Sequence, residues 1–288
     1  MTSRERLLTV LNGGIPDRVP ISTYELSGWN TRAFENNDPS YARLMQAIRE
    51  RTDCACMWDP PSNETLMLSA SPVEIEVAEE RIGNETVTHR RAHTPKGGLT
   101  ETGRIVDNVH TTWRTERLCK TPTDVDTALS VPFEPLTYDY SDYDRIAAEV
   151  GDHGILMASP PDALCIAAEL MEFGEFTLWA YTETEHFVRT LDEIHERNMT
   201  NLRRMLDAKV LDLYRICGPE YATPPYLPRE MFERFVTPYV RDMVRLIHER
   251  GGKARFHCHG RIGQVGEASS QVAASEPDRL GIHDPLAL

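Results

Sequence analysis

The sequence lacks any long apolar run. No stretch of ~18 apolar residues, the length needed to cross a membrane as a helix, occurs among its 288 residues. The charged residues Arg4, Glu5 and Arg6 near the start are not followed by the apolar run that a signal peptide requires. We therefore expect a cytoplasmic protein with no membrane contact.

Basic charge is also scarce. The chain has 31 Lys and Arg against 45 Asp and Glu, which gives a formal net charge of -14. No basic patch interleaved with aromatic residues is present, and an acidic surface repels phosphate backbones, so nucleic acid is excluded as a partner. The six cysteines are scattered and do not form the framework of a disulfide-stapled domain; most are expected to be reduced and buried.

Three common catalytic motifs are absent. There is no G-x-G-x-x-G or Walker loop, so a dinucleotide or nucleoside triphosphate would lack its usual phosphate cradle. There is no G-x-S-x-G elbow either, which removes the usual signal of an α/β-hydrolase. An enzyme acting on a small-molecule substrate has to use other residues.

Strand and helix patterns alternate over most of the chain. Apolar segments predict strands at Cys54–Trp58, Gly154–Ser159, Val210–Ile216 and Lys253–His259. Helical spacing predicts helices over 163–171, 176–181, 185–208 and 229–250, and an earlier helix starts near Asp38-Pro39 with Leu44 and Ile48 on its inner face. Repeated βα units predict a parallel sheet in an α/β fold. No domain boundary is visible, so residues 1–288 are expected to form one domain.

The segment from about residue 73 to 116 follows a different rhythm. Its alternation has a period of two, as in Glu74-Ile75-Glu76-Val77, and a Gly97-Gly98 turn divides it. We interpret this segment as an antiparallel hairpin inserted into the parallel fold.

Two histidines stand at the end of the last predicted strand. Residues two apart on a strand face the same side, so His257 and His259 should point together, at the strand end where parallel β/α folds place their sites. They could offer two nitrogen ligands to a metal, although H-x-H also occurs where both rings only hydrogen-bond to nearby backbone.

Two carboxylates follow other strands. Glu220 comes directly after the preceding strand and could complete a His₂Glu set of the kind found in catalytic zinc sites; alternatively it is a loop carboxylate or caps the next helix. Asp59, before Pro60-Pro61, could serve as a general acid or base, or it is an ordinary turn residue.

The residues around these sites resemble a known superfamily. The opening from Arg4 to Pro20, with Asn12-Gly13 and Pro16-Asp17-Arg18-Val19-Pro20, is similar to the start of uroporphyrinogen decarboxylase-superfamily proteins. The block from Gly218-Pro219-Glu220 through 235–252 to His257-Cys258-His259-Gly260 is similar to the same superfamily. The resemblance spans most of the chain to about Gly263, and it implies a TIM-type (β/α)₈ barrel.

The superfamily includes true decarboxylases and zinc-dependent methyltransferases that work with corrinoid proteins. True decarboxylases resemble one another in a segment of the type M-R-Q-A-G-R-Y, whose arginines suit a substrate with many carboxylates. The corresponding stretch, 24–30, contains no arginine, and the first arginine after it is Arg32. The methyltransferase branch carries H-x-C and a later cysteine that bind zinc, whereas this chain has H-x-H, and zinc accepts either ligand.

The resemblance therefore favours a zinc-dependent methyltransferase-like enzyme, with His257, His259 and Glu220 on the metal and a corrinoid held by a partner protein. One alternative is uroporphyrinogen decarboxylation in porphyrin biosynthesis, in which Asp59 would stabilise a protonated pyrrole. A second is an inactive, truncated family member. A homo-oligomer also stays open.

The end of the chain departs from the family. Where the superfamily continues through further βα units, residues 266–288 form a polar segment with sparse apolar positions and no further ligand motif. We expect an incomplete barrel, with at most one helix near Gly263–Ala274 after the last strand.

Overall fold

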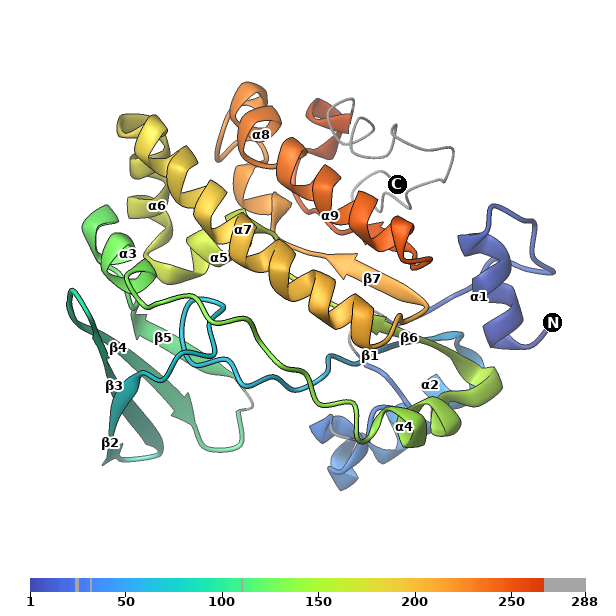
Figure 1. Ribbon diagram of the computed structural model, residues 1–288. Helices are drawn as coiled ribbons and strands as arrows, with labels where there is room; N and C mark the ends of the chain where they lie inside the picture. Colours follow the sequence, from blue (N-terminus) through green and yellow to red (C-terminus); the bar gives the residue numbers. More distant parts are fainter. Residues whose placement is uncertain (24–25, 32, 110, 267–288) are drawn as a thin grey trace.

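The computed structural model describes residues 1–23, 26–31, 33–109 and 111–266. Two separate sheets organise this part of the chain (Figure 1). One is parallel and carries the main core; the other is antiparallel and more exposed. Within the described residues no helix is both long and apolar enough to cross a membrane.

The parallel sheet has the strand order β1-β6-β7-β8. Its strands are β1 (Cys54–Met57), β6 (Gly154–Ala158), β7 (Leu213–Ile216) and β8 (Ala254–Phe256). Every neighbouring pair is parallel, which confirms the parallel α/β prediction. The described residues contain these four parallel strands and do not close them into a barrel.

Helices cover this sheet unevenly. Figure 1 shows α7 lying across the sheet, with α5, α6, α8 and α9 beside it. The α-helices are α1 (Ser3–Leu11), α2 (Ala42–Arg51), α3 (Pro122–Leu129), α4 (Tyr143–Val150), α5 (Ala163–Leu170), α6 (Phe173–Thr182), α7 (Thr184–Ala208), α8 (Arg229–Phe235) and α9 (Thr237–Glu249). Short 3₁₀ turns are η1 (Phe34–Asn36), η2 (Pro39–Tyr41), η3 (Gly151–His153), η4 (Pro219–Ala222) and η5 (Ile262–Gln264).

Strand β6 shows how the core is divided. All five of its residues are buried. Leu156 and Ala158 belong to the main cluster with the large helices, whereas Ile155 and Met157 belong to a smaller cluster into which the leucines of α1 pack. Residues two apart on a strand share a face, so α1 covers the opposite face from α7.

Helix α1 is also held by charge. A capping box starts this helix, with Thr2 accepting from the Glu5 N–H. Arg6 donates to Asp53 at 2.6 Å and to Asp17 at 2.6 Å, and Arg18 donates to Asp53 at 2.8 Å. Asp53 is fully buried, so this network joins the N-terminal segment to the residue that precedes β1.

Two helical details differ from the sequence expectation. The helix predicted over 229–250 is broken into α8 and α9 at Val236, because Pro238 has no N–H to donate to the preceding turn and its ring clashes with a carbonyl of that turn. In α2, Leu44 is 46% exposed, while Met45 and Ile48 face the core. The prediction that Leu44 faces inward is therefore wrong, whereas Ile48 is buried as predicted, because the buried stripe runs through Met45 and Ile48.

The second sheet is larger than the predicted hairpin. It is a four-stranded antiparallel meander of β2 (Glu74–Ile82), β3 (Glu85–Thr94), β4 (Gly97–Val106) and β5 (Thr112–Glu116). Gly83 adopts a φ of 60° at the tight turn between β2 and β3, where a residue with a side chain would be strained. Figure 1 places this sheet at the end of the molecule toward which the β7 arrow points.

The predicted helix near Gly263–Ala274 lies mostly outside the described residues. Inside them, η5 makes a single turn and Val265 is buried. The polar segment 267–288, on which the prediction of an incomplete barrel depends, also lies outside the described residues.

Candidate metal centre

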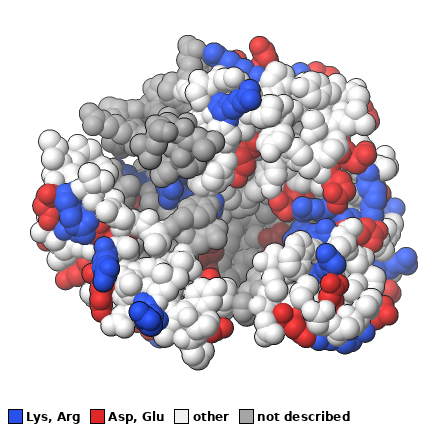
Figure 2. Space-filling view, turned by 180° about the vertical axis from the view of Figure 1, so that it is seen from behind, with Lys and Arg blue, Asp and Glu red and all other residues white. Residues whose placement is uncertain are grey.

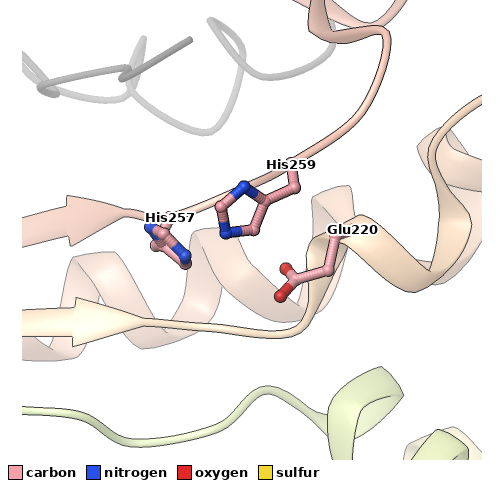
Figure 3. Close-up of side chains that lie close together, drawn as sticks. All are labelled: Glu220, His257 and His259. Carbon is pink, nitrogen blue, oxygen red and sulfur yellow. The ribbon is translucent and has the colours of Figure 1, made fainter. Parts of the chain in front are cut away.

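Three side chains meet where β7 and β8 end. His257 and His259 follow the last residue of β8, and Glu220 lies in η4, directly after β7. One potential ligand atom from each residue lies within 4.8 Å of the others. The two imidazole rings are 4.5 Å apart between centroids and nearly perpendicular, and Figure 3 shows both on the side that faces Glu220.

The topology explains this meeting. Neighbouring parallel strands end at the same edge of a sheet, and β7 pairs directly with β8. The His257 N–H continues the ladder by donating to the Ile216 carbonyl at 3.0 Å. The two histidines and the glutamate are 37 or more positions apart in sequence only because α8 and α9 intervene.

Thr223 fixes the two ligand-bearing segments to each other. Its buried hydroxyl lies 2.8 Å from the Glu220 carbonyl and 3.0 Å from the His259 carbonyl. Gly260 makes this approach possible, because a Cβ at that position would stand 2.4 Å from the Thr223 hydroxyl. Gly260 also has a φ of +104°, where a side chain is disfavoured.

The chemistry of the donor set fits zinc. Two imidazole nitrogens and one carboxylate are the protein ligands of several catalytic zinc sites, which leave a further position for water or substrate. The Gly218 N–H donates to Glu220 Oε2 at 3.1 Å and thereby orients the carboxylate. His257 is buried, whereas His259 is exposed, so the group opens to one side.

A pocket of about 310 Å³ lies on that open side. Its lining consists of Phe173, Glu220, Tyr221, Tyr226, His259 and Gly260. The rings of Phe173 and Tyr226 meet edge to face at 4.8 Å between centroids. A small molecule bound in this pocket would therefore touch two of the three potential ligands and rest on aromatic rings.

Asp59 lies at the end of β1 and joins a different contact. Its Oδ1 accepts the Ser159 N–H at 2.7 Å, which links the end of β1 to the end of β6. Asp59 is exposed and is not among the residues that line the pocket beside the histidines. The predicted acid or base role of Asp59 stays a prediction.

A thiol pair next to this centre was not predicted. Cys217, the first residue after β7, accepts a hydrogen bond from Cys165 of α5, and this bond together with the nearby charge of Arg215 lowers the pKa of Cys217 to about 7. The same hydrogen bond and burial raise the pKa of Cys165. The place of Cys217 between a strand end and Glu220 was a usable signal, but nothing in the sequence marks Cys165.

A buried acid lies beside the pair. Asp162 caps α5 by accepting the Cys165 N–H at 2.7 Å, and it is almost completely buried. Burial, which disfavours the charged carboxylate, raises its pKa well above the usual range.

Comparison with known proteins agrees with this architecture. The family model for uroporphyrinogen decarboxylase (URO-D) matches residues 117–284, which is more than half of the chain. A solved methyltransferase from Methanosarcina mazei is similar in fold, with a TM-score of 0.55 over 94% of this chain and 74% of that chain at 16% sequence identity. No curated protein sequence matches significantly. The chain belongs to the uroporphyrinogen decarboxylase family.

Proposed function

We propose that this protein is a zinc-dependent methyltransferase-like enzyme, which passes a methyl group between a corrinoid carried by a partner protein and a small-molecule thiol. The observation that carries the proposal is the convergence of Glu220, His257 and His259 within 4.8 Å. The fold likeness to a methyltransferase supports it. We further propose that the parallel sheet is part of an incomplete (β/α)₈ barrel.

In this proposal His257, His259 and Glu220 hold the metal. Zinc bound there would lower the pKa of an acceptor thiol and keep it as a nucleophilic thiolate. The carboxylate of Glu220 offsets part of the positive charge, and the Gly218 N–H keeps it in place. The rings of Phe173 and Tyr226 would hold the body of the thiol and keep water from it.

Asp59 is the proposed acid or base of this chemistry. Its Oδ1 accepts the Ser159 N–H, which holds the carboxylate at the carboxyl ends of β1 and β6. A decarboxylase would need no metal, and the stretch that corresponds to its arginine-rich segment has no arginine before Arg32.

Elemental analysis of the purified protein tests the metal. We expect about one zinc per chain in the wild type and a loss of most of it in His257→Ala and Glu220→Gln, since each removes one of three ligands. His89→Ala is the matched control, because His89 is an exposed histidine of β3 outside the site and should leave the zinc content unchanged.

Turnover tests the reaction. Methylcobalamin with a panel of small thiols should give methyl thioether in the wild type, and His257→Ala should lose this activity while remaining folded by circular dichroism. Asp59→Asn should keep the zinc and lower the turnover. Decarboxylation of uroporphyrinogen by metal-free protein, without methyl transfer by the zinc-loaded protein, would overturn the proposal.

A further inference from the structure

A second and larger cavity lies between the antiparallel meander and the helices. Its volume is about 560 Å³, within the usual range for small-molecule sites. It shares no lining residue with the pocket beside the histidines. Figure 2 shows side chains of both charges gathered in the band between the sheet and the helices.

The floor and walls of this cavity are mostly apolar. Loop 64–68, which follows β1, contributes one wall, and the meander contributes a second. Leu118, between β5 and α3, together with Pro161 and helix α5, contributes the rest. The apolar lining residues are Leu66, Met67, Leu68, Ile75, Ala92, Leu118, Pro161, Ile166 and Leu170. Such a surface suits the hydrocarbon or aromatic body of a ligand.

One wall is held in a strained conformation. Met67 and Leu68 have φ values of 52° and 61°, in the left-handed region that favours glycine. Two buried side chains of α7 hold them there: Arg197 donates to the Met67 carbonyl at 3.3 Å and Asn201 donates to the Leu68 carbonyl at 2.7 Å. Strain that persists under such constraint is typical of binding sites.

The charges around the mouth do not all neutralise one another. Arg90 donates to Glu101 at 2.9 Å, and Arg117 donates to Glu169 at 2.7 Å. Tyr221 donates to the other oxygen of Glu169. These contacts occupy two of the carboxylates that line the cavity.

Arg114 is left with a weak interaction. Its nearest acid is Glu169 at 3.9 Å, and in the described part of the chain its guanidinium makes no hydrogen bond. The third lining carboxylate, Glu64, is exposed and accepts the Leu68 N–H of its own loop at 2.9 Å. The cavity thus presents an apolar surface and one guanidinium with unused donors, which matches a carboxylate in geometry and charge.

We propose that this cavity binds a small organic acid, with its carboxylate on Arg114 and its apolar body against loop 66–68 and α5. The site is separate from the metal centre, and the proposal does not depend on the methyl-transfer function. The ligand class is an aliphatic or aromatic monocarboxylate.

Calorimetric titration with a series of ω-phenyl carboxylates, from phenylacetate to 6-phenylhexanoate, tests this proposal on the full chain. At least one acid should bind, and its primary amide and its amine analogue should bind roughly tenfold or more weakly, because neither offers a charged acceptor to Arg114. Equal binding of acid and amide, or no binding by any acid up to millimolar concentration, would overturn the proposal.

Variants locate the site. Arg114→Gln should weaken acid binding by roughly tenfold or more without changing the melting temperature of the free protein, since Arg114 is exposed. Arg104→Gln is the matched control, because Arg104 is an exposed β4 arginine paired with Glu85 and lies outside the cavity. His257→Ala should still bind the acid. Unchanged binding in Arg114→Gln would contradict the assignment.

Discussion

The parallel sheet with its helices (the body) and the antiparallel meander β2–β5 differ in how much of each is buried. In the body, β6 is buried along its whole length and the helices meet over rings such as Phe176, Trp179 and Phe187. In the meander, β2 is exposed at eight of its nine positions and β5 at four of its five. Cross-strand ion pairs, such as Arg90 with Glu101, accompany its backbone ladder.

This difference in burial indicates which of the two parts determines folding stability. Apolar burial provides the large favourable contribution to folding, whereas exposed ion pairs contribute little. The body should therefore determine the stability of the chain. The exposed positions of the meander can change with little cost to the fold, and the same sheet forms a wall of the larger cavity.

The largest effect should come from the body core. Phe187 is fully buried, and the rings of Trp179 and Phe235 lie 4.9 and 4.8 Å from it between centroids. Phe187→Ala should lower the free energy of unfolding by ~3–5 kcal/mol, measured by urea denaturation. Leu178→Ala removes a large side chain that is 55% exposed on α6 and should change it little. If Phe187→Ala lowered the free energy of unfolding only slightly, the body would not determine the stability of the chain.

An intermediate effect is expected where the meander meets the body. Leu99 of β4 is buried in the main core cluster. Leu99→Ala should cost ~2–3 kcal/mol, and hydrogen exchange should accelerate in β2–β5 more than in β6 and β7. Ile105→Ala, at a more exposed position of the same strand, is the control. Equal acceleration in both sheets would show that they unfold as one unit.

The smallest effect concerns the buried charge network around Asp53. Burial alone would raise the pKa of Asp53, but hydrogen bonds from the Ile21 N–H, Ser3, Arg6 and Arg18 outweigh it and lower the pKa. A carboxylate with a lowered folded-state pKa stabilises the fold above its ordinary pKa of ~4, and that stability is lost as the pH falls toward the folded-state value.

Asp53→Asn should therefore lower the melting temperature by a few degrees at pH 7, and the gap to the wild type should narrow as the pH falls below about 4. Asp144→Asn removes a carboxylate that is 91% exposed and should leave both the temperature and its pH dependence unchanged. A gap that stays constant with pH would show that Asp53 acts through packing rather than charge.

The sequence predicted the parts that follow from local pattern and sheet geometry. The parallel strands were visible as apolar segments followed by helices. The meeting of Glu220 with His257 and His259 followed from one rule, that adjacent parallel strands end at the same edge.

Other features depend on contacts that no local pattern encodes. The orientation of α2, with Met45 rather than Leu44 inside, is set by what the helix packs against. The thiol pair joins Cys165 of one helix to Cys217 of a distant strand end. The larger cavity needs the meander to fold back onto α5, and a period-two pattern gives the strands but not their place.

The position of the Thr223 hydroxyl affects the binding free energy of the proposed metal site. Because it lies against the backbone of both Glu220 and His259, the distant segments that carry two of the proposed ligands are already held together in the free protein. Little conformational entropy is then lost when an ion arrives. A larger part of the interaction energy between metal and ligands should then contribute to the binding free energy. The structure of the site should also change little when the metal binds.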